Sequence, residues 1–283
     1  MKLKDKTIVV TGGSIGIGLA VCKKIALEGG KVIIFARDKN NLINAVESLE
    51  EISNIYHHFF VGDVSNLTDV KVFSDWVRDE FGEIHGLVNC AGVYGPIGKS
   101  TDVDMKDFLD TITINLMGTV YMCSAFSKIF SPNSKKKIVN YSGGGAGGAF
   151  PNYSAYAASK AAIVRFTENL SIELAEDNFE VNCVGPGFVA TRLHQKTLNI
   201  GPDIAGKSFY ESTIKQLENG SIPPEKAADL TAFLLSDDSN GITGKFISAP
   251  WDPWYEDSFQ ELLKNDKDFA TLRRIDNKIV FKK

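Results

Sequence analysis

The chain has few of the features that mark disulfide-rich, metal-binding and membrane proteins. Its four cysteines, Cys22, Cys90, Cys123 and Cys183, lie far apart in apolar runs, and no CxxC pair occurs. This spacing indicates neither a disulfide framework nor a zinc site, and it suits a reducing compartment. The sequence contains no apolar run of membrane-spanning length, and the residues before Thr7 do not form an apolar signal region. We therefore expect a cytoplasmic protein without a bound metal.

An excess of positive charge is also absent. The 283 residues carry 31 Lys and Arg against 35 Asp and Glu, a net charge of −4, and the pI is about 5.7. This balance gives no electrostatic footprint for nucleic acid or an anionic membrane, so we expect neither as a partner. Hydrophobic residues make up 43% and charged residues 23%, as in an ordinary globular protein of one large domain or two small ones.

The first segment that carries chemistry is a glycine-rich turn between a strand and a helix. Residues 7–11 (TIVVT) are short, continuous and β-branched, as in a buried strand. The sequence GGSIGIG follows at 12–18, and apolar residues then recur at helical spacing up to Leu27. Glycines let a backbone approach a pyrophosphate, and a helix N-terminus offers free N–H groups. The segment predicts a dinucleotide-binding loop.

This turn, Thr11 to Gly18, resembles the TGxxxGxG motif of the short-chain dehydrogenase/reductase family. Further motifs similar to those of the family follow in order: Asp63-Val64, Asn89-Cys90-Ala91-Gly92, Tyr156-Ala157-Ala158-Ser159-Lys160, and Pro186-Gly187 with Thr191. The resemblance covers residues 5–248 and implies one dinucleotide-binding catalytic domain over 1–248. It implies an α/β fold: a doubly wound Rossmann-type sheet of about seven mostly parallel strands flanked by helices, with the site at their carboxyl ends.

The resemblance also implies which residues contact the cofactor. Asp63 would bond the adenine amino group, Asn89 would begin a turn beside the adenosine, and Pro186-Gly187 would hold the nicotinamide carboxamide. The expected cofactor-binding residues are Gly12, Ser14, Ile15, Gly16, Ile17, Gly18, Arg37, Asp63, Val64, Asn89, Ala91, Gly92, Tyr156, Lys160, Pro186, Gly187, Val189 and Thr191.

The end of the second strand favours NADP over NAD. In NAD-preferring Rossmann proteins an acidic residue ends this strand and binds the ribose 2′-hydroxyl. Ala36 occupies that position here, and Arg37 follows. A guanidinium suits a 2′-phosphate, although Arg37 could instead be a turn residue paired with Asp38. We expect NADP(H), with NAD as the alternative.

The third strand holds two adjacent histidines, His57 and His58. Consecutive residues of a strand point to opposite faces, so the pair cannot easily share a metal ion, and we expect both to be structural. Ser65, a few residues later, is the expected N-cap of a helix over 67–81.

Tyr156 and Lys160 are the candidates for acid–base chemistry. Residues four apart lie on one helical face, and an ammonium near a phenol stabilises the phenolate, which otherwise forms at about pH 10. A surface tyrosine and a solvated lysine would show the same spacing, but the ordered motifs upstream favour catalysis. Asn115 is a polar residue in an apolar helical stretch, which indicates a kink or a buried hydrogen bond. The resemblance implies that Lys160 binds the nicotinamide ribose and that Asn115 ends a proton relay.

The catalytic serine of the family is displaced in this chain. It usually lies thirteen residues before the tyrosine, where Gly143 stands, and Ser142 directly precedes that glycine. The glycine run that follows could form a bulge and re-aim the Ser142 hydroxyl. We predict that Ser142 orients the substrate oxygen; the alternative is a protein that lacks this serine.

Two segments follow the motifs less regularly. Residues 192–224 are interrupted by Gly201-Pro202 and Pro223-Pro224, and the resemblance implies that they form a substrate lid. Residues 249–283 form a C-terminal extension that most relatives lack. We expect the extension to pack on the same or a neighbouring subunit; the alternative is that its aromatic residues line a substrate pocket suited to sugars, namely Trp251, Trp254 and Tyr255.

Together these features predict an NADP(H)-dependent oxidoreductase that interconverts a secondary alcohol and a ketone of a small-molecule substrate, with a sugar-type substrate as one option. One alternative is a sugar-nucleotide epimerase or dehydratase with bound NAD, which the lack of a large substrate domain argues against. Another is a non-catalytic dinucleotide sensor, which Gly143 favours and the retained Tyr156 and Lys160 disfavour. Because the helix after Tyr156 is strongly apolar and relatives associate through it, we expect a homo-tetramer or homo-dimer.

Overall fold

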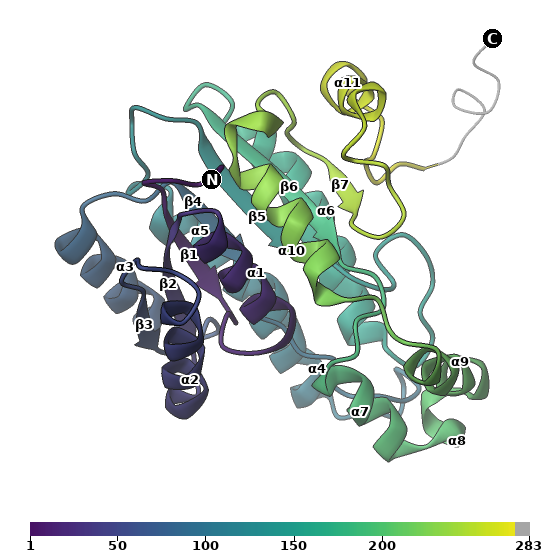
Figure 1. Cartoon of the computed structure of the whole chain (residues 1–283). Coiled ribbons are helices and arrows are strands. Elements are labelled where there is room, and N and C mark those ends of the chain that lie inside the picture. Colours follow the sequence, from purple (N-terminus) through teal and green to yellow (C-terminus); the bar gives the residue numbers. More distant parts are fainter. Residues whose placement is uncertain (275–283) are drawn as a thin grey trace, which may run out of the picture.

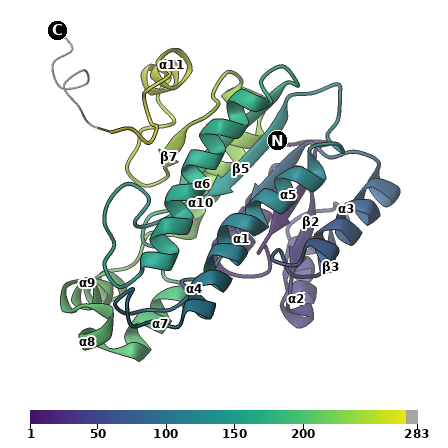
Figure 2. The same cartoon turned by 180° about the vertical axis from the view of Figure 1, so that it is seen from behind.

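The protein, described here over residues 1–274 by a computed structural model, has one sheet between two layers of helices (Figures 1 and 2). The strands are β1 (Thr7–Thr11), β2 (Lys31–Ala36), β3 (His58–Val61), β4 (Gly86–Asn89), β5 (Lys136–Tyr141), β6 (Phe179–Gly185) and β7 (Phe246–Ser248). They form a seven-stranded sheet in the order β3-β2-β1-β4-β5-β6-β7, and every neighbouring pair is parallel. The expected doubly wound α/β fold is confirmed.

Each face of the sheet buries a separate apolar core. The helices on one face are α1 (Gly16–Leu27), α2 (Lys39–Glu50) and α10 (Pro224–Leu235), and those on the other are α3 (Leu67–Phe81), α5 (Gly118–Phe126) and α6 (Ser154–Glu173) (Figures 1 and 2). Within β1, Ile8 and Val10 belong to the first core and Val9 to the second, because successive side chains of a strand alternate between faces. This double burial explains why the strands are continuous apolar runs in the sequence.

The strand order reverses between β1 and β4, and ligands of such sheets bind at that switch point, beyond the carboxyl ends. Three short helices lie together beyond that end of the sheet: α7 (Arg192–Ile200), α8 (Pro202–Ala205) and α9 (Lys207–Glu218) (Figure 1). They occupy the segment expected to form the lid. Another helix near this end, α4 (Met105–Ile112), continues through a π-helical segment, Thr113–Met117, into α5.

The C-terminal extension packs on its own chain as far as it is described. It contains α11 (Asp257–Asn265), which follows a short 3-10 turn at Asp237–Ser239 and strand β7. The Trp254 ring lies 5.5 Å from that of Phe233 on α10, and its indole N–H donates to the Ala249 carbonyl at 3.3 Å. Residues 275–283 of the extension lie outside the described residues.

The sequence predicts that the chain forms no disulfide framework, metal site or membrane-spanning helix. All four cysteines are free thiols. Over residues 1–274, no group of three or more His, Cys, Asp and Glu side chains gathers in a way that could hold a metal ion. Among the same residues, no helix is both long and apolar enough to cross a membrane.

Candidate active site

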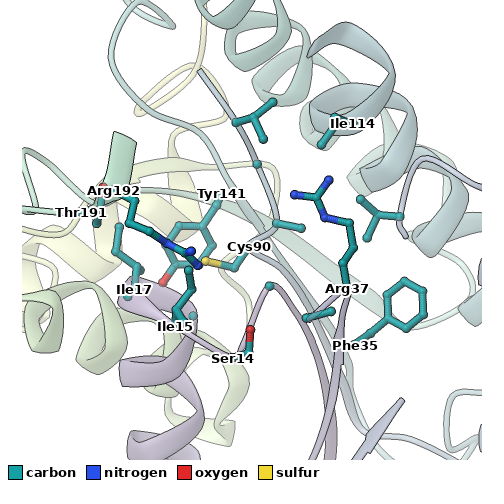
Figure 3. Close-up of a pocket in the computed structure, with 18 of the residues that line it drawn as sticks. Ser14, Ile15, Ile17, Phe35, Arg37, Cys90, Ile114, Tyr141, Thr191 and Arg192 are labelled. Atoms are coloured by element: carbon teal, nitrogen blue, oxygen red, sulfur yellow. The ribbon is translucent and has the colours of Figure 1, made fainter. Parts of the chain in front are cut away.

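A cavity of about 640 Å³ opens at the carboxyl ends of the central strands (Figure 3). Its volume lies in the range that small molecules and cofactors occupy in proteins. Most of the predicted site residues meet at its wall, although they come from every third of the chain. These are Gly12, Ser14, Ile15, Gly16, Ile17, Gly18, Arg37, Asp63, Val64, Ala91, Gly92, Ser142, Tyr156, Lys160, Pro186 and Thr191.

Four predicted residues do not line this cavity: Asn89, Asn115, Gly187 and Val189. Asn89 is buried beneath it, and its amide donates to the Oδ1 atom of Asn140 on the neighbouring strand at 2.9 Å. Asn89 therefore joins two central strands and supports the cavity floor from below.

The cavity wall also includes residues that the sequence analysis did not assign to it. Phe35, Asp38, Asn41, Cys90, Val93, Ile114, Tyr141 and Arg192 are the main ones. Several are neighbours of predicted residues, and their position after a strand could have suggested them. Arg192 also follows a predicted residue, Thr191, but nothing in the sequence indicated that its side chain would reach the cavity, because the placement of the lid over the sheet depends on tertiary packing.

The glycine-rich turn has the shape of an anion cradle. Gly12 has φ +66°, and a Cβ atom on Gly18 would lie 2.2 Å from the Gly12 carbonyl oxygen, so the turn closes tightly on itself. Helix α1 begins after Ile15 without a side-chain cap. The first N–H groups of a helix have no intrahelical partner, so here they can bind an anion. The turn therefore fits the diphosphate of a dinucleotide.

The part of the cavity wall that follows β2 and β3 is polar and carries charges of both signs. Arg37 is 63% exposed, and its guanidinium pairs with the Asp63 carboxylate at 3.6 Å rather than with Asp38. Asp38 instead caps α2 by accepting from the Asn41 N–H at 2.8 Å. The simple turn pair Arg37–Asp38, which the sequence left open, is therefore not formed.

The expected cap of α3 was wrong by one residue. Asn66 accepts from the N–H groups of Thr68 and Asp69, whereas the Ser65 hydroxyl donates to Asp63 at 2.7 Å. The Asp63 carboxylate therefore accepts two hydrogen bonds from Ser65, one from its hydroxyl and one from its backbone N–H. These contacts fix the carboxylate at the cavity wall.

Tyr156 and Lys160 both lie on α6 and are buried. The Lys160 Nζ atom donates to the Tyr141 carbonyl at 2.9 Å and lies 5.7 Å from the centroid of the Tyr156 ring. The expectation that Lys160 lowers the pKa of the Tyr156 phenol was wrong for this structure: burial raises that pKa above its ordinary value, with a smaller contribution from Cys90, and burial lowers the pKa of Lys160. The phenol is accordingly protonated at neutral pH, in the state that can donate a proton.

Asn115 lies in the π-helical segment and is fully buried. Its Oδ1 atom accepts from the Val93 N–H at 2.8 Å, and its amide donates to the Val93 carbonyl and to the Ser159 hydroxyl, both at 2.9 Å. The distortion and the buried hydrogen bonds that the sequence indicated are both present. Asn115 and Lys160 flank the same glycine: a Cβ atom on Gly92 would lie 3.2 Å from Asn115 Oδ1 and 3.4 Å from Lys160 Nζ.

Ser142 and Gly143 follow β5 and differ in what they present to the site. The buried Ser142 hydroxyl donates to the Lys160 carbonyl at 3.1 Å. A Cβ atom on Gly143 would lie 2.2 Å from the phenolic oxygen of Tyr156. In this structure backbone, rather than a hydroxyl, therefore lies against the reactive phenol.

Residues of the lid pack near Tyr156 as part of an aromatic cluster. The Tyr94 ring lies edge-on to that of Tyr156 with centroids 4.8 Å apart, and the Tyr94 hydroxyl shares a 3.1 Å hydrogen bond with His194 Nε2 on α7. Phe150 and Tyr153 belong to the same cluster. Burial lowers the pKa of His194 to about 4, so the imidazole is neutral at physiological pH.

Comparison with known proteins decides the family. A family model described as short chain dehydrogenase matches residues 6–199. The chain belongs to the short-chain dehydrogenase/reductase family.

Similar proteins cover nearly the whole catalytic part of this short-chain dehydrogenase/reductase. An uncharacterized oxidoreductase of Bacillus subtilis, YxbG, is 31% identical over 249 residues, which are 88% of this chain and 90% of that protein. The structure of L-sorbose reductase from Gluconobacter frateurii with NADPH and L-sorbose is 25% identical with a TM-score of 0.78, covering 88% of this chain and 96% of that one. Actinorhodin polyketide ketoreductase with NADPH is also 25% identical with a TM-score of 0.78, covering 86% of this chain and 95% of that one.

Family membership establishes the reaction type at the coarse level. The protein is an NAD(P)-dependent dehydrogenase/reductase acting on CH–OH groups. The cavity, whose wall carries the anion cradle and the buried Tyr156 and Lys160, fits a nicotinamide dinucleotide and a small substrate.

Proposed function

We propose that this short-chain dehydrogenase/reductase uses NADP(H) to interconvert a secondary alcohol and a ketone. The observation that carries the proposal is the buried Tyr156 phenol on the cavity wall, one helical turn from Lys160. NADPH, when bound, supplies the hydride to the carbonyl carbon. Tyr156 donates its proton to the carbonyl oxygen, so the alcohol forms with atoms and charges balanced. In the oxidative direction the phenolate takes that proton back.

The chain's own residues would serve this proton transfer. The Lys160 ammonium lies beside the phenol ring, so it stabilises the phenolate that remains after donation. Lys160 also binds the nicotinamide ribose, and Asn115 supports the relay that returns a proton to the site. The support for this relay is that Asn115 and Lys160 both lie against Gly92.

We assign the orientation of the substrate oxygen to Ser142. It lines the cavity and is buried, and its hydroxyl can reach substrate only by leaving the Lys160 carbonyl. Rotation about the first side-chain torsion between staggered wells would accomplish this change. A positioned donor of this kind stabilises the charge that develops on the oxygen during reaction.

NADP(H) is favoured over NAD(H) by the end of β2. Ala36 offers no carboxylate for a ribose 2′-hydroxyl, and Arg37 presents an exposed guanidinium at the cavity wall. L-sorbose reductase and actinorhodin polyketide ketoreductase, both similar to this chain, were solved with NADPH. Asn89, Gly187 and Val189 do not line the cavity; in this proposal Asn89 supports the cavity floor, and Gly187 and Val189 remain expected contacts of the nicotinamide end.

A sugar-type substrate is a second candidate within the same reaction. The similarity to L-sorbose reductase favours it. The tail aromatics do not, because Trp251 is 73% exposed and neither it, Trp254 nor Tyr255 lines the cavity.

The test is spectrophotometric NADPH oxidation with purified protein and a panel of ketones and keto-sugars. Turnover of ketones supports the proposed reaction, and the best substrate defines its class. Dinucleotide binding without turnover of any carbonyl would favour a sensor. Conversion of a sugar nucleotide with bound NAD and no net NADPH consumption would favour an epimerase or dehydratase.

We also propose the domain arrangement and assembly. In this proposal residues 1–248 form the catalytic domain with a lid at about 192–224, and residues 249–283 are a C-terminal extension on the same or a neighbouring subunit, of which residues 249–274 are described. A homo-tetramer or homo-dimer, cytoplasmic in location, would bury the exposed apolar residues on α6 and α4: Ile172 is 77%, Leu109 63% and Met105 58% exposed. Sedimentation that shows only a species near 30.9 kDa at micromolar concentration would refute the assembly.

A further inference from the structure

Arg192 reaches the cofactor cavity from the lid. It is the first residue of α7, and its side chain lines the cavity together with Thr191. In Figure 3 its guanidinium lies on the side of Ile15 and Ile17, across the cavity from Arg37. The two arginines therefore approach different parts of any molecule in the cavity.

The start of α7 lies directly against the glycine-rich turn. A Cβ atom built on Gly16 would be 3.7 Å from the Cγ2 atom of Thr191. Gly16 is the first residue of α1, where the uncapped N–H groups can receive an anion. Thr191 also has a buried hydroxyl oxygen without a hydrogen-bond partner among the described residues. The residue that follows, Arg192, is therefore placed beside the predicted diphosphate position.

The charge distribution of the cavity leaves a role for this guanidinium. The turn GGSIGIG at 12–18 contains no basic residue. Of the other cations on the wall, Arg37 pairs with Asp63 at 3.6 Å and Lys160 donates to the Tyr141 carbonyl at 2.9 Å. Arg192 is exposed, and within residues 1–274 its guanidinium has no hydrogen bond or ion pair.

A diphosphate presents two negative charges and several acceptor oxygens, which a planar guanidinium binds in bidentate fashion. We propose that Arg192 binds the diphosphate of the dinucleotide from the lid side, next to the α1 cradle, and that this contact holds the start of α7 in place when the cofactor is bound. This inference rests on the proposed dinucleotide-dependent function. Under this proposal the two arginines bind different groups of the cofactor: Arg192 contacts the diphosphate common to NADP and NAD, and Arg37 contacts the 2′-phosphate that only NADP carries.

The test measures dissociation constants of the full-length protein for NADPH, NADH, ADP-ribose and adenosine 2′-monophosphate by calorimetry. Arg192→Gln should weaken the first three ligands by the same factor, about tenfold, since a charge-assisted contact at an exposed site is lost. Adenosine 2′-monophosphate, which has no diphosphate, should bind as to the wild type. Arg192→Lys should recover part of the affinity, and Lys207→Gln, which removes another exposed lid cation outside the cavity, should change none of the four.

A second readout tests whether this contact holds α7 in place. ADP-ribose should slow amide hydrogen exchange of residues 194–200 in the wild type and not in Arg192→Gln at matched occupancy. Unchanged ADP-ribose affinity in Arg192→Gln, or loss restricted to NADPH and adenosine 2′-monophosphate, would overturn the assignment to the diphosphate. A wild type that binds ADP-ribose without slower exchange in the lid would overturn the effect on α7. A wild type that binds no dinucleotide would instead refute the proposed function itself, and this inference with it.

Discussion

Gly143 and Tyr156 are in such close approach that a single methyl group would not fit between them. A Cβ atom on Gly143 would lie 2.2 Å from the phenolic oxygen of Tyr156. No carbon and oxygen approach this closely without bonding, so any side chain at this position requires the phenol or the loop to shift. The glycine is therefore part of what sets the position of the acid–base group.

Gly143→Ala should lower kcat by about 100-fold, because a displacement of about 1 Å at a reacting group costs that much. NADPH affinity should be unchanged, since the anion cradle lies elsewhere in the cavity. Gly148→Ala is the matched control in the same loop, because a Cβ atom there meets nothing within 4 Å. Steady-state kinetics of the two variants would decide, and wild-type turnover by Gly143→Ala would show that the phenol position is not constrained.

Tyr156→Phe should reduce turnover by at least about 100-fold, since it removes the proton donor and leaves the ring to pack as before. Cofactor titration should show wild-type affinity. Because burial raises the pKa of this phenol, reduction by the wild type should persist through neutral pH and decline only when alkaline conditions remove the proton. Activity of the variant within a few-fold of the wild type would contradict the acid–base role.

Ser142→Ala tests the substrate-orienting hydroxyl. The loss of one preorganised donor should lower kcat by about 10²- to 10³-fold, whereas NADPH affinity should stay the same because the hydroxyl would face substrate. The complementary variant is Gly143→Ser, which places a hydroxyl at the position where relatives carry it; because its Cβ atom would also crowd the Tyr156 phenol, we expect it to lower kcat as Gly143→Ala does. If Ser142→Ala is close to wild type and Gly143→Ser raises turnover, the usual serine has been lost and Ser142 only bonds the Lys160 carbonyl.

Arg37→Ala should weaken NADPH binding by about tenfold and leave NADH binding almost unchanged, because only NADPH carries the 2′-phosphate. Fluorescence titration with both cofactors provides the comparison within one protein. The effect should be moderate because Arg37 is 63% exposed and is shared with Asp63. Tighter binding of NADH than of NADPH by the wild type would show that the end of β2 was misinterpreted.

Acidification should destabilise the fold through its buried histidines. The His57 side chain is 1% exposed, its Nδ1 atom accepts from the Val32 N–H at 3.1 Å, and burial lowers its pKa to about 4. A histidine whose pKa is depressed in the fold stabilises it fully above the unfolded pKa of about 6.5, and loses this contribution as pH falls toward 4, at up to about 1.4 kcal/mol per pH unit. His194 titrates in the same window.

Urea unfolding at pH 7 and pH 5 would measure this loss. His57→Gln retains an acceptor without a titrating ring, so the free energy of unfolding should fall less between the two pH values than in the wild type. An equal fall in both proteins would assign the acid sensitivity to other groups.

Much of the local structure follows from the sequence alone. The strand, glycine turn and helix at the N-terminus, and the placement of Tyr156 and Lys160 on one helical face, depend on periodicity and on fixed spacings within one element. Such features do not depend on contacts between segments that are far apart in the sequence. The misplaced cap at Ser65 shows the limit of this reasoning, because adjacent polar residues compete for one position and only the backbone path selects Asn66.

The tertiary structure decided the contacts between segments far apart in the chain. Arg37 pairs with Asp63 because β2 and β3 end side by side, and the Ser142 hydroxyl turns to α6 because β5 passes beneath that helix. Arg192 reaches the glycine-rich turn only because the lid folds back over the sheet. Spacing along the sequence fixes which side chains share an element. Which elements meet, and which side chain enters the cavity between them, is set by the packing of the whole domain.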